Sequence, residues 1–213
     1  MILGRPVAGE ATSETQSAPE RILEAACDLI AAEGIDEVRI ARVAMRAGAS
    51  TALVHHYFST REELLEQALI HSFELAGDER FQKPAGVTET ATQALARGIS
   101  ECLPFPGAQE RDWVLWVELW LRGVREPELR PVAARLYARY RDWMADLIRA
   151  GVASGEFRAD VDVGAVADVA MALLDGVGVR ALMRDPTMDV EAARKLVRER
   201  LATELGLDPD ALT

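Results

Sequence analysis

The sequence predicts an all-α protein in two parts, a small N-terminal unit of short helices and a larger C-terminal helical body. Two observations predict this fold class. From Pro19 onward most apolar residues fall at helical spacing, and no alternating segment is long enough to form a sheet. The segment Lys83-Pro84-Ala85-Gly86 breaks the helical pattern and marks the boundary between the two parts.

The composition is that of a folded protein, with 49% hydrophobic and 28% charged residues. No apolar run approaches the roughly 20 residues of a membrane span, and the N-terminus lacks the apolar core of a secretory signal. The two cysteines, Cys27 and Cys102, are too few for a disulfide framework and indicate free thiols. We therefore expect a cytoplasmic protein that makes no membrane contact.

The chain begins with a segment rich in Gly, Ser, Thr and Ala, residues 1–18, which we interpret as a disordered arm. A first helix is expected from Pro19, a favoured first-turn residue, to Gly34, a favoured helix terminator. Its apolar residues recur at helical spacing and form one stripe: Ile22, Ala25, Ala26 and Leu29.

Two short helices and one long helix follow. The second helix, RIARVAMRA, is ended by Gly48, and Ser50 can cap the third, TALVHHYF. Ser59 or Thr60 can cap the fourth, REELLEQALIHSFELAGDERF, whose acidic first turn suits a helix N-terminus.

The body, residues 87–206, is predicted to contain five longer helices, followed by a short tail over residues 207–213. Glycine or proline lies at or close beyond the end of most of them, as is usual at helix termini. The predicted helices span Thr88–Cys102, Arg111–Arg125, Glu128–Ser154, Val163–Arg184 and Val190–Leu205.

A basic island lies within this acidic protein. The chain has a net charge of -11 and should repel nucleic acid as a whole. Residues 38–61 nevertheless contain four arginines, two histidines and no acidic residue. A fluctuation of composition is the alternative, but Arg39, Arg42 and Arg46 are spaced to share one helix face. The island is therefore the place where this protein could meet DNA.

The two short helices joined through Gly48 have the pattern of a helix-turn-helix, in which the second helix enters the major groove of DNA. Its N-terminal residues are small or hydroxylic, which suits close approach: Ser50, Thr51 and Ala52. A metal site at His55 and His56 is the rival interpretation. Adjacent helical residues point about 100° apart, and no further ligand lies at suitable spacing, so we expect no metal and no cofactor.

The segment GASTALVHHYFSTREELL resembles the helix-turn-helix of the tetracycline-repressor (TetR) family, and the upstream ILEAACDLIAAEGIDEVRIARVAMRAG resembles the first two helices of that family. The resemblance covers about residues 19–79 and implies a DNA-binding domain over residues 19–81. There are departures from the family pattern. His55 stands where Tyr is usual, Arg61 replaces Lys, and Arg39 occupies a position where Thr commonly caps the helix.

Carried over by position, the resemblance implies base or groove contacts from Thr51, Ala52 and His56. Val54 and Phe58 are interpreted as core residues. With the positioning contacts to phosphate, the predicted DNA-binding set is Arg39, Arg42, Arg46, Ser50, Thr51, Ala52, His55, His56, Tyr57 and Arg61.

An aromatic cluster occupies the body. All four tryptophans and two of the three tyrosines lie within residues 113–143, and the segment WVLWVELWLRGV is apolar almost all round, which favours a central helix. The cluster is either plain core or the wall of a ligand cavity between helices. The resemblance favours a cavity, because TetR proteins bind small effectors in this part. The predicted effector-binding set is Trp113, Trp116, Glu118, Trp120, Tyr137, Tyr140, Trp143, Met144, Met171 and Asp175.

Two classes of effector fit such a cavity. An amine or other cation could lie against aromatic faces, with Glu118 or Asp175 as its counter-charge. A flat or apolar aromatic molecule fits as well, and Glu118 could instead pair with Arg122 one helical turn away. The segment GVASGEFRADVDVGAVADVAMALLDGV also resembles the choline-sensing, BetI-like branch of the family.

The last two helices, residues 163–205, are rich in small and apolar residues and are predicted to form a homodimer, although burial within one chain is an alternative. The sequence thus indicates a dimer that binds a palindromic operator. The resemblance implies a repressor that is released by an effector, and activation is the alternative. Regulation would act through the fourth helix, which joins the DNA-binding domain to the body. A helical scaffold protein without specific DNA binding is the rival class. No catalytic motif supports an enzyme.

Overall fold

The computed structural model describes residues 16–82 and 88–212, and all regular structure within these ranges is helical, as predicted. The predicted boundary at residues 83–86 and most of the predicted arm lie outside the described residues. The elements are α1 (Ala18–Glu33), η1 (Ile35–Glu37), α2 (Ile40–Arg46), α3 (Thr51–Tyr57), α4 (Arg61–Phe81), α5 (Ala91–Glu101), α6 (Ala108–Arg125), η2 (Pro127–Leu129), α7 (Arg130–Ser154), α8 (Val163–Leu182) and α9 (Val190–Leu205).

Local signals fix most helix ends. Ser17 and Glu20 form a capping box at the start of α1, and Gly34 ends this helix with a φ of 85°. Thr60 rather than Ser59 caps α4, because its hydroxyl accepts from the backbone N–H of Glu63 at 3.0 Å. Three starts differ from prediction by two residues or more. Helix α5 begins at Ala91 instead of Thr88, α6 begins at Ala108 instead of Arg111, and the turn η2 precedes α7.

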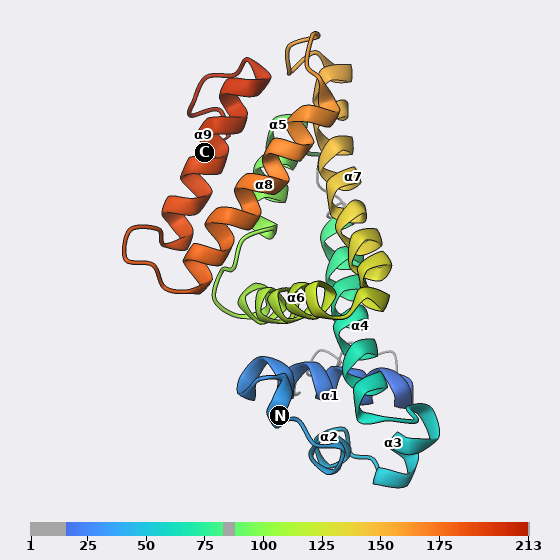
Figure 1. Cartoon of the computed structure of the whole chain (residues 1–213). Helices are drawn as coiled ribbons and strands as arrows, with labels where there is room; N and C mark the ends of the chain where they lie inside the picture. The colour runs from blue at the N-terminus through green and yellow to red at the C-terminus, as the bar shows by residue number, and fades with distance from the viewer. Residues whose placement is uncertain (1–15, 83–87, 213) are drawn as a thin grey trace, which may run out of the picture.

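Helices α1, α2 and α3 form a small unit against the N-terminal half of α4, which then runs on into the body (Figure 1). The core of this unit includes fully buried Ile22, Ile30 and Leu65. Val54 and Phe58 are also buried, which confirms their interpretation as core. Because α4 carries core residues of both parts, a displacement of α4 would change the packing of both.

In the body, α6 lies across the axis of α4, while α7, α8 and α9 extend away from the small unit (Figure 1). The prediction of a central α6 holds only in part. Trp113, Trp116 and Leu119 are buried, but Leu121 is 43% and Val124 72% exposed. The sequence pattern shows that α6 is apolar almost all round. It does not show that one side of the C-terminal half of α6 is exposed.

Both cysteines are buried free thiols, and burial raises the pKa of each to about 12. The thiol of Cys27 donates to the backbone carbonyl of Ala68 at 3.1 Å and so helps to join α1 to α4. None of the described helices combines the length and the apolarity that a bilayer crossing requires.

Candidate DNA-binding surface and effector cavity

The helix-turn-helix is built by α2, a turn at Gly48 and α3. Gly48 has a φ of 62°, a conformation that glycine adopts without strain, and the N–H of Ala49 reaches back to the carbonyl of Ala44 at 2.9 Å. The Ser50 hydroxyl accepts from the N–H of Leu53 at 3.1 Å and caps α3. Ser50 therefore sets the start of the helix that is predicted to enter the groove.

The outer face of α3 carries the predicted base contacts. Val54 points into the core, and exposed side chains surround it on both sides: Thr51, Ala52, His55, His56 and Tyr57. The rings of His56 and Tyr57 meet edge to face with their centroids 5.0 Å apart. Among the residues described, no group of His, Cys, Asp and Glu side chains is placed to hold a metal ion.

The arginines of the basic island are engaged with α1 and η1. Arg42 forms an ion pair with Glu33, and Arg46 Nη2 lies 2.7 Å from Asp28 Oδ2. Arg39 donates to the carbonyl of Asp36 at 2.6 Å, and α2 has no side-chain cap. Exposed ion pairs contribute little to stability, so Arg42 and Arg46 can exchange their carboxylates for DNA phosphates.

The structure gives Arg61 partners within the protein. Its Nε donates to the carbonyl of Val38 and its Nη2 to the carbonyl of Ile35, both at 2.7 Å. Its side chain is 28% exposed. Arg61 therefore holds η1 in place instead of standing free for a phosphate. The sequence could not show this, because the partners lie more than 20 residues away.

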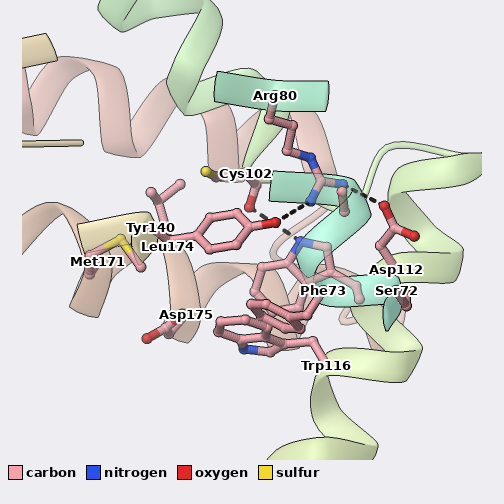
Figure 2. Close-up of a pocket in the computed structure, with 12 residues that line it drawn as sticks. Ser72, Phe73, Arg80, Cys102, Asp112, Trp116, Tyr140, Met171, Leu174 and Asp175 are labelled. Carbon is pink, nitrogen blue, oxygen red and sulfur yellow. Dashed lines mark hydrogen bonds and ion pairs between the residues drawn. The ribbon is translucent and has the colours of Figure 1, made fainter. Parts of the chain in front are cut away.

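A cavity lies between α4, α6, α7 and α8 (Figure 2). Its volume is about 50 Å³, where a single water needs about 10–15 Å³. The lining residues are Ser72, Phe73, Ala76, Arg80, Cys102, Asp112, Trp113, Trp116, Tyr140, Met171, Leu174 and Asp175. The aromatic cluster is therefore partly the wall of a cavity as well as core.

Three aromatic rings from three helices form one side of the cavity. Phe73 of α4 stacks on Trp116 of α6 with centroids 3.5 Å apart, and Tyr140 of α7 meets both rings edge to face, at 5.2 and 5.6 Å. Trp113 is fixed by its indole N–H, which donates to the carbonyl of Cys102 at 3.2 Å. The rings are thus held by packing and by hydrogen bonds.

Charged groups lie at separate parts of the cavity wall. Arg80 donates to the Tyr140 hydroxyl at 3.0 Å and to Asp112 Oδ2 at 2.7 Å (Figure 2). Asp175 accepts from the Tyr137 hydroxyl at 2.6 Å. Burial raises the pKa of the Asp175 carboxyl to about 6. The charge of Arg80 is balanced by Asp112, whereas the partner of Asp175 is a neutral phenol.

Five of the predicted effector residues line the cavity: Trp113, Trp116, Tyr140, Met171 and Asp175. Four others do not line it but lie in the surrounding core. Trp120 packs edge-on to Trp113 and Trp116, Tyr137 holds Asp175, Trp143 packs on Phe81, and Met144 is fully buried.

Glu118, also in the predicted effector set, does not line this cavity. It lines a separate polar cleft between η1 and the C-terminal half of α6, with Asp36 and Arg122 nearby. Burial, with a contribution from Asp36, raises the pKa of Glu118. Trp116 faces the cavity, and Glu118 lies two residues later on the same helix. Its side chain therefore points about 200° away from that of Trp116.

The lining residues that the sequence prediction missed come mostly from α4. Phe73, Ala76 and Arg80 are spaced i, i+3, i+7 and share a face of that helix. Ser72, Cys102, Asp112 and Leu174 complete the lining. The spacing shows that these residues share a face of α4, but it does not show which helices that face meets.

Comparison with known proteins identifies the family. The model for the TetR family of bacterial regulatory proteins matches residues 22–68. The model for the C-terminal part of BetI-type transcriptional repressors matches residues 91–206, more than half of the chain. The chain belongs to the TetR family. The regulator is therefore a DNA-binding, ligand-responsive transcription factor and not an enzyme, as the sequence predicted.

Relatives extend over nearly the whole regulator. The transcriptional regulator BetI of Brucella anthropi is 24% identical over 184 residues, 86% of this chain and 91% of the relative. BetI of Escherichia coli O45:K1 is 24% identical over 198 residues, 88% of this chain and 94% of the relative.

Solved structures show the same fold. A transcriptional regulator from Saccharomonospora viridis, in complex with choline, has a TM-score of 0.75 and 32% identity, covering 84% of this chain and 93% of that one. A TetR-family regulator from Rhodococcus sp. has a TM-score of 0.74 and 28% identity, covering 88% and 98%. No comparison supports the alternative of a scaffold protein.

Proposed function

We propose that the regulator is a homodimeric repressor whose affinity for a palindromic operator is lowered by a small organic cation bound in the cavity. The observation that carries the effector class is the wall formed by Phe73, Trp116 and Tyr140 together with the carboxylate of Asp175. Ring faces attract a cation through their quadrupoles, by about 0.5–2 kcal/mol for each well-placed ring. A quaternary or tertiary ammonium group is a cation of this kind.

The balance of charge also favours a cation. Asp175 carries a negative charge above its raised pKa and has no cationic partner among the described contacts. Arg80 would repel a cation, but Asp112 neutralises it at 2.7 Å. The choline found in the Saccharomonospora viridis relative is a ligand of the same class. A neutral aromatic effector would leave the buried charge of Asp175 without a cationic partner.

DNA binding is proposed to use the exposed face of α3 for base contacts and α2 for phosphates. Thr51, Ala52 and His56 are exposed on α3, and Arg42 and Arg46 on α2 hold carboxylates that phosphates can replace. His55, Tyr57 and Arg39 would add contacts beside them.

The effector class is tested with choline and its neutral isostere 3,3-dimethyl-1-butanol, which has the same shape without the charge. Trp fluorescence reports binding, because Trp113 and Trp116 line the cavity. We expect choline to quench the emission and the isostere to bind at least about tenfold more weakly, the loss of one favourable cation–π site. Equal affinity for the two molecules would contradict a cationic effector and favour a neutral one.

A further inference from the structure

Arg111, near the start of α6, joins the body to the DNA-binding domain. Its Nη2 donates to Glu24 Oε2 at 2.9 Å, and its Nε lies 3.0 Å from Asp28 Oδ1 without the alignment of a hydrogen bond. Both carboxylates belong to α1. The side chain of Arg111 is 27% exposed, so solvent screens these pairs less than it screens pairs at the surface.

The same carboxylate of α1 reaches the DNA-binding surface. Asp28 Oδ2 accepts from Arg46 Nη2 at 2.7 Å and from Arg46 Nε at 3.1 Å. Asp28 is therefore shared between Arg111 of the body and Arg46 of α2. A movement of Arg111 changes how strongly Asp28 attracts Arg46. It therefore changes how easily Arg46 can exchange Asp28 for a DNA phosphate.

On its other side Arg111 reaches the cavity. Arg111 Nη1 lies 3.7 Å from Oδ1 of its neighbour Asp112, whose Oδ2 accepts from Arg80 at 2.7 Å. Arg80 in turn donates to the Tyr140 hydroxyl, and Figure 2 shows this group at the cavity wall. Polar contacts thus run without a break from cavity to DNA-binding surface through Tyr140, Arg80, Asp112, Arg111, Asp28 and Arg46.

We propose that Arg111 couples the effector cavity to the DNA-binding surface, through Asp112 on one side and Asp28 on the other. This inference rests on the proposed function, because it explains how that cavity regulates operator binding. Arg111 is a positioning residue that contacts neither DNA nor effector. An effector that engages Tyr140 or Asp112 changes how Arg80 and Arg111 share the carboxylate of Asp112. The pairing of Arg111 with Asp28 then changes, and so does the freedom of Arg46.

Coupling between two binding sites is reciprocal, so operator binding must also alter the cavity. This gives a readout that needs no effector, because all four tryptophans lie in the body and two line the cavity. An operator duplex selected from a random pool is titrated into the protein, with Trp emission and labelled-DNA anisotropy recorded together. We expect the parent emission to change on binding, and Arg111→Gln to bind the duplex with less than half of that change.

The control is Arg141→Gln. Arg141 pairs with Asp168 between α7 and α8, outside the path to α1, and its loss should leave the emission change intact. Arg111→Lys keeps the charge but cannot bridge two carboxylates as a guanidinium can, so it should give an intermediate change. If Arg111→Gln does not fold, as judged by its melting, Asp28→Asn tests the same link from α1 and should lose the change as well.

The proposal is overturned if the parent emission ignores the operator, or if Arg111→Gln responds as fully as the parent. A second arm measures operator affinity with choline present. We expect choline to weaken parent binding by about tenfold, which is within the usual range of allosteric coupling, and to weaken Arg111→Gln binding by about threefold or less. A parent whose emission responds to the operator but not to choline would count against the cationic effector and would leave the role of Arg111 supported.

Discussion

At the scale of the residue, Asp175 shows how burial changes the pKa of a carboxyl in the proposed effector cavity. Its carboxylate lies among apolar and aromatic side chains, and this burial raises its pKa to about 6, while the Tyr137 hydroxyl acts in the opposite direction. A free Asp has a pKa of about 3.9, so the folded state takes up this proton at a higher pH than the unfolded state does. The contribution of Asp175 to stability therefore improves as the pH falls from about 6 to about 4.

Cation binding should show the opposite pH dependence. Below the raised pKa Asp175 becomes neutral and no longer attracts a cation, so we expect choline affinity to fall by about tenfold between pH 7.5 and pH 5, following the ionised fraction. Asp175→Asn should bind choline weakly, with little pH dependence, as measured by Trp quenching. Asp168→Asn, an exposed carboxylate on the same helix, is the control. An Asp175→Asn protein with the parent profile would show that Asp175 does not face the effector.

At the scale of the element, we propose that α2 and α3 make different kinds of contact with DNA. Arg46 lies on α2 with its charge toward the surface, whereas Thr51 begins α3 and is exposed at its N-terminal end. Phosphate contacts act on every sequence, but base contacts act on specific ones. Substitutions on α2 should therefore change the affinity for every DNA sequence, whereas substitutions on α3 should change which sequence is preferred.

Arg46→Ala should weaken binding to operator and random duplexes alike and reduce the slope of log K against log salt by about 1. Thr51→Ala should change the preferred sequence and leave the salt slope unaltered. Anisotropy titrations at several salt concentrations measure both effects. Arg149→Ala, an exposed arginine of α7, serves as the control. If Arg46→Ala keeps the parent slope, Arg46 does not contact a phosphate.

The helices themselves are largely predictable, because their signals are local. Ser50 and Thr60 cap the helices expected of them, and Gly155 and Gly206 end α7 and α9 with positive φ. The cavity was only half predicted, because its lining depends on which helix faces meet. Arg80 lines the cavity only because α4 crosses α6 and α7, and no spacing within one helix encodes that crossing.

At the scale of the whole molecule, α8 and α9 lie side by side and form one flank of the body, on the left in Figure 1. Small and apolar residues are exposed along one face of α8 at steps of three and four: Ala165, Val169, Ala172 and Gly176. Met183, directly after the end of α8, is also exposed. Leu196 of α9 is 38% exposed. Small residues let helices approach closely, so we propose that two copies pair through residues 163–205, as the sequence prediction has it.

This interface should be necessary for tight operator binding, because a two-fold dimer places two recognition helices about one DNA turn apart. Ala172→Arg puts a charge at the centre of the exposed stripe on α8, and we expect a monomer in sedimentation at micromolar concentration. The variant should keep its helical circular dichroism and its choline quenching but lose about 100-fold or more in operator affinity, since one half-site must then suffice. Ala138→Arg makes the same change at an exposed position of α7 and should leave the dimer intact. A dimeric Ala172→Arg protein would place the contact between the two copies elsewhere on the body.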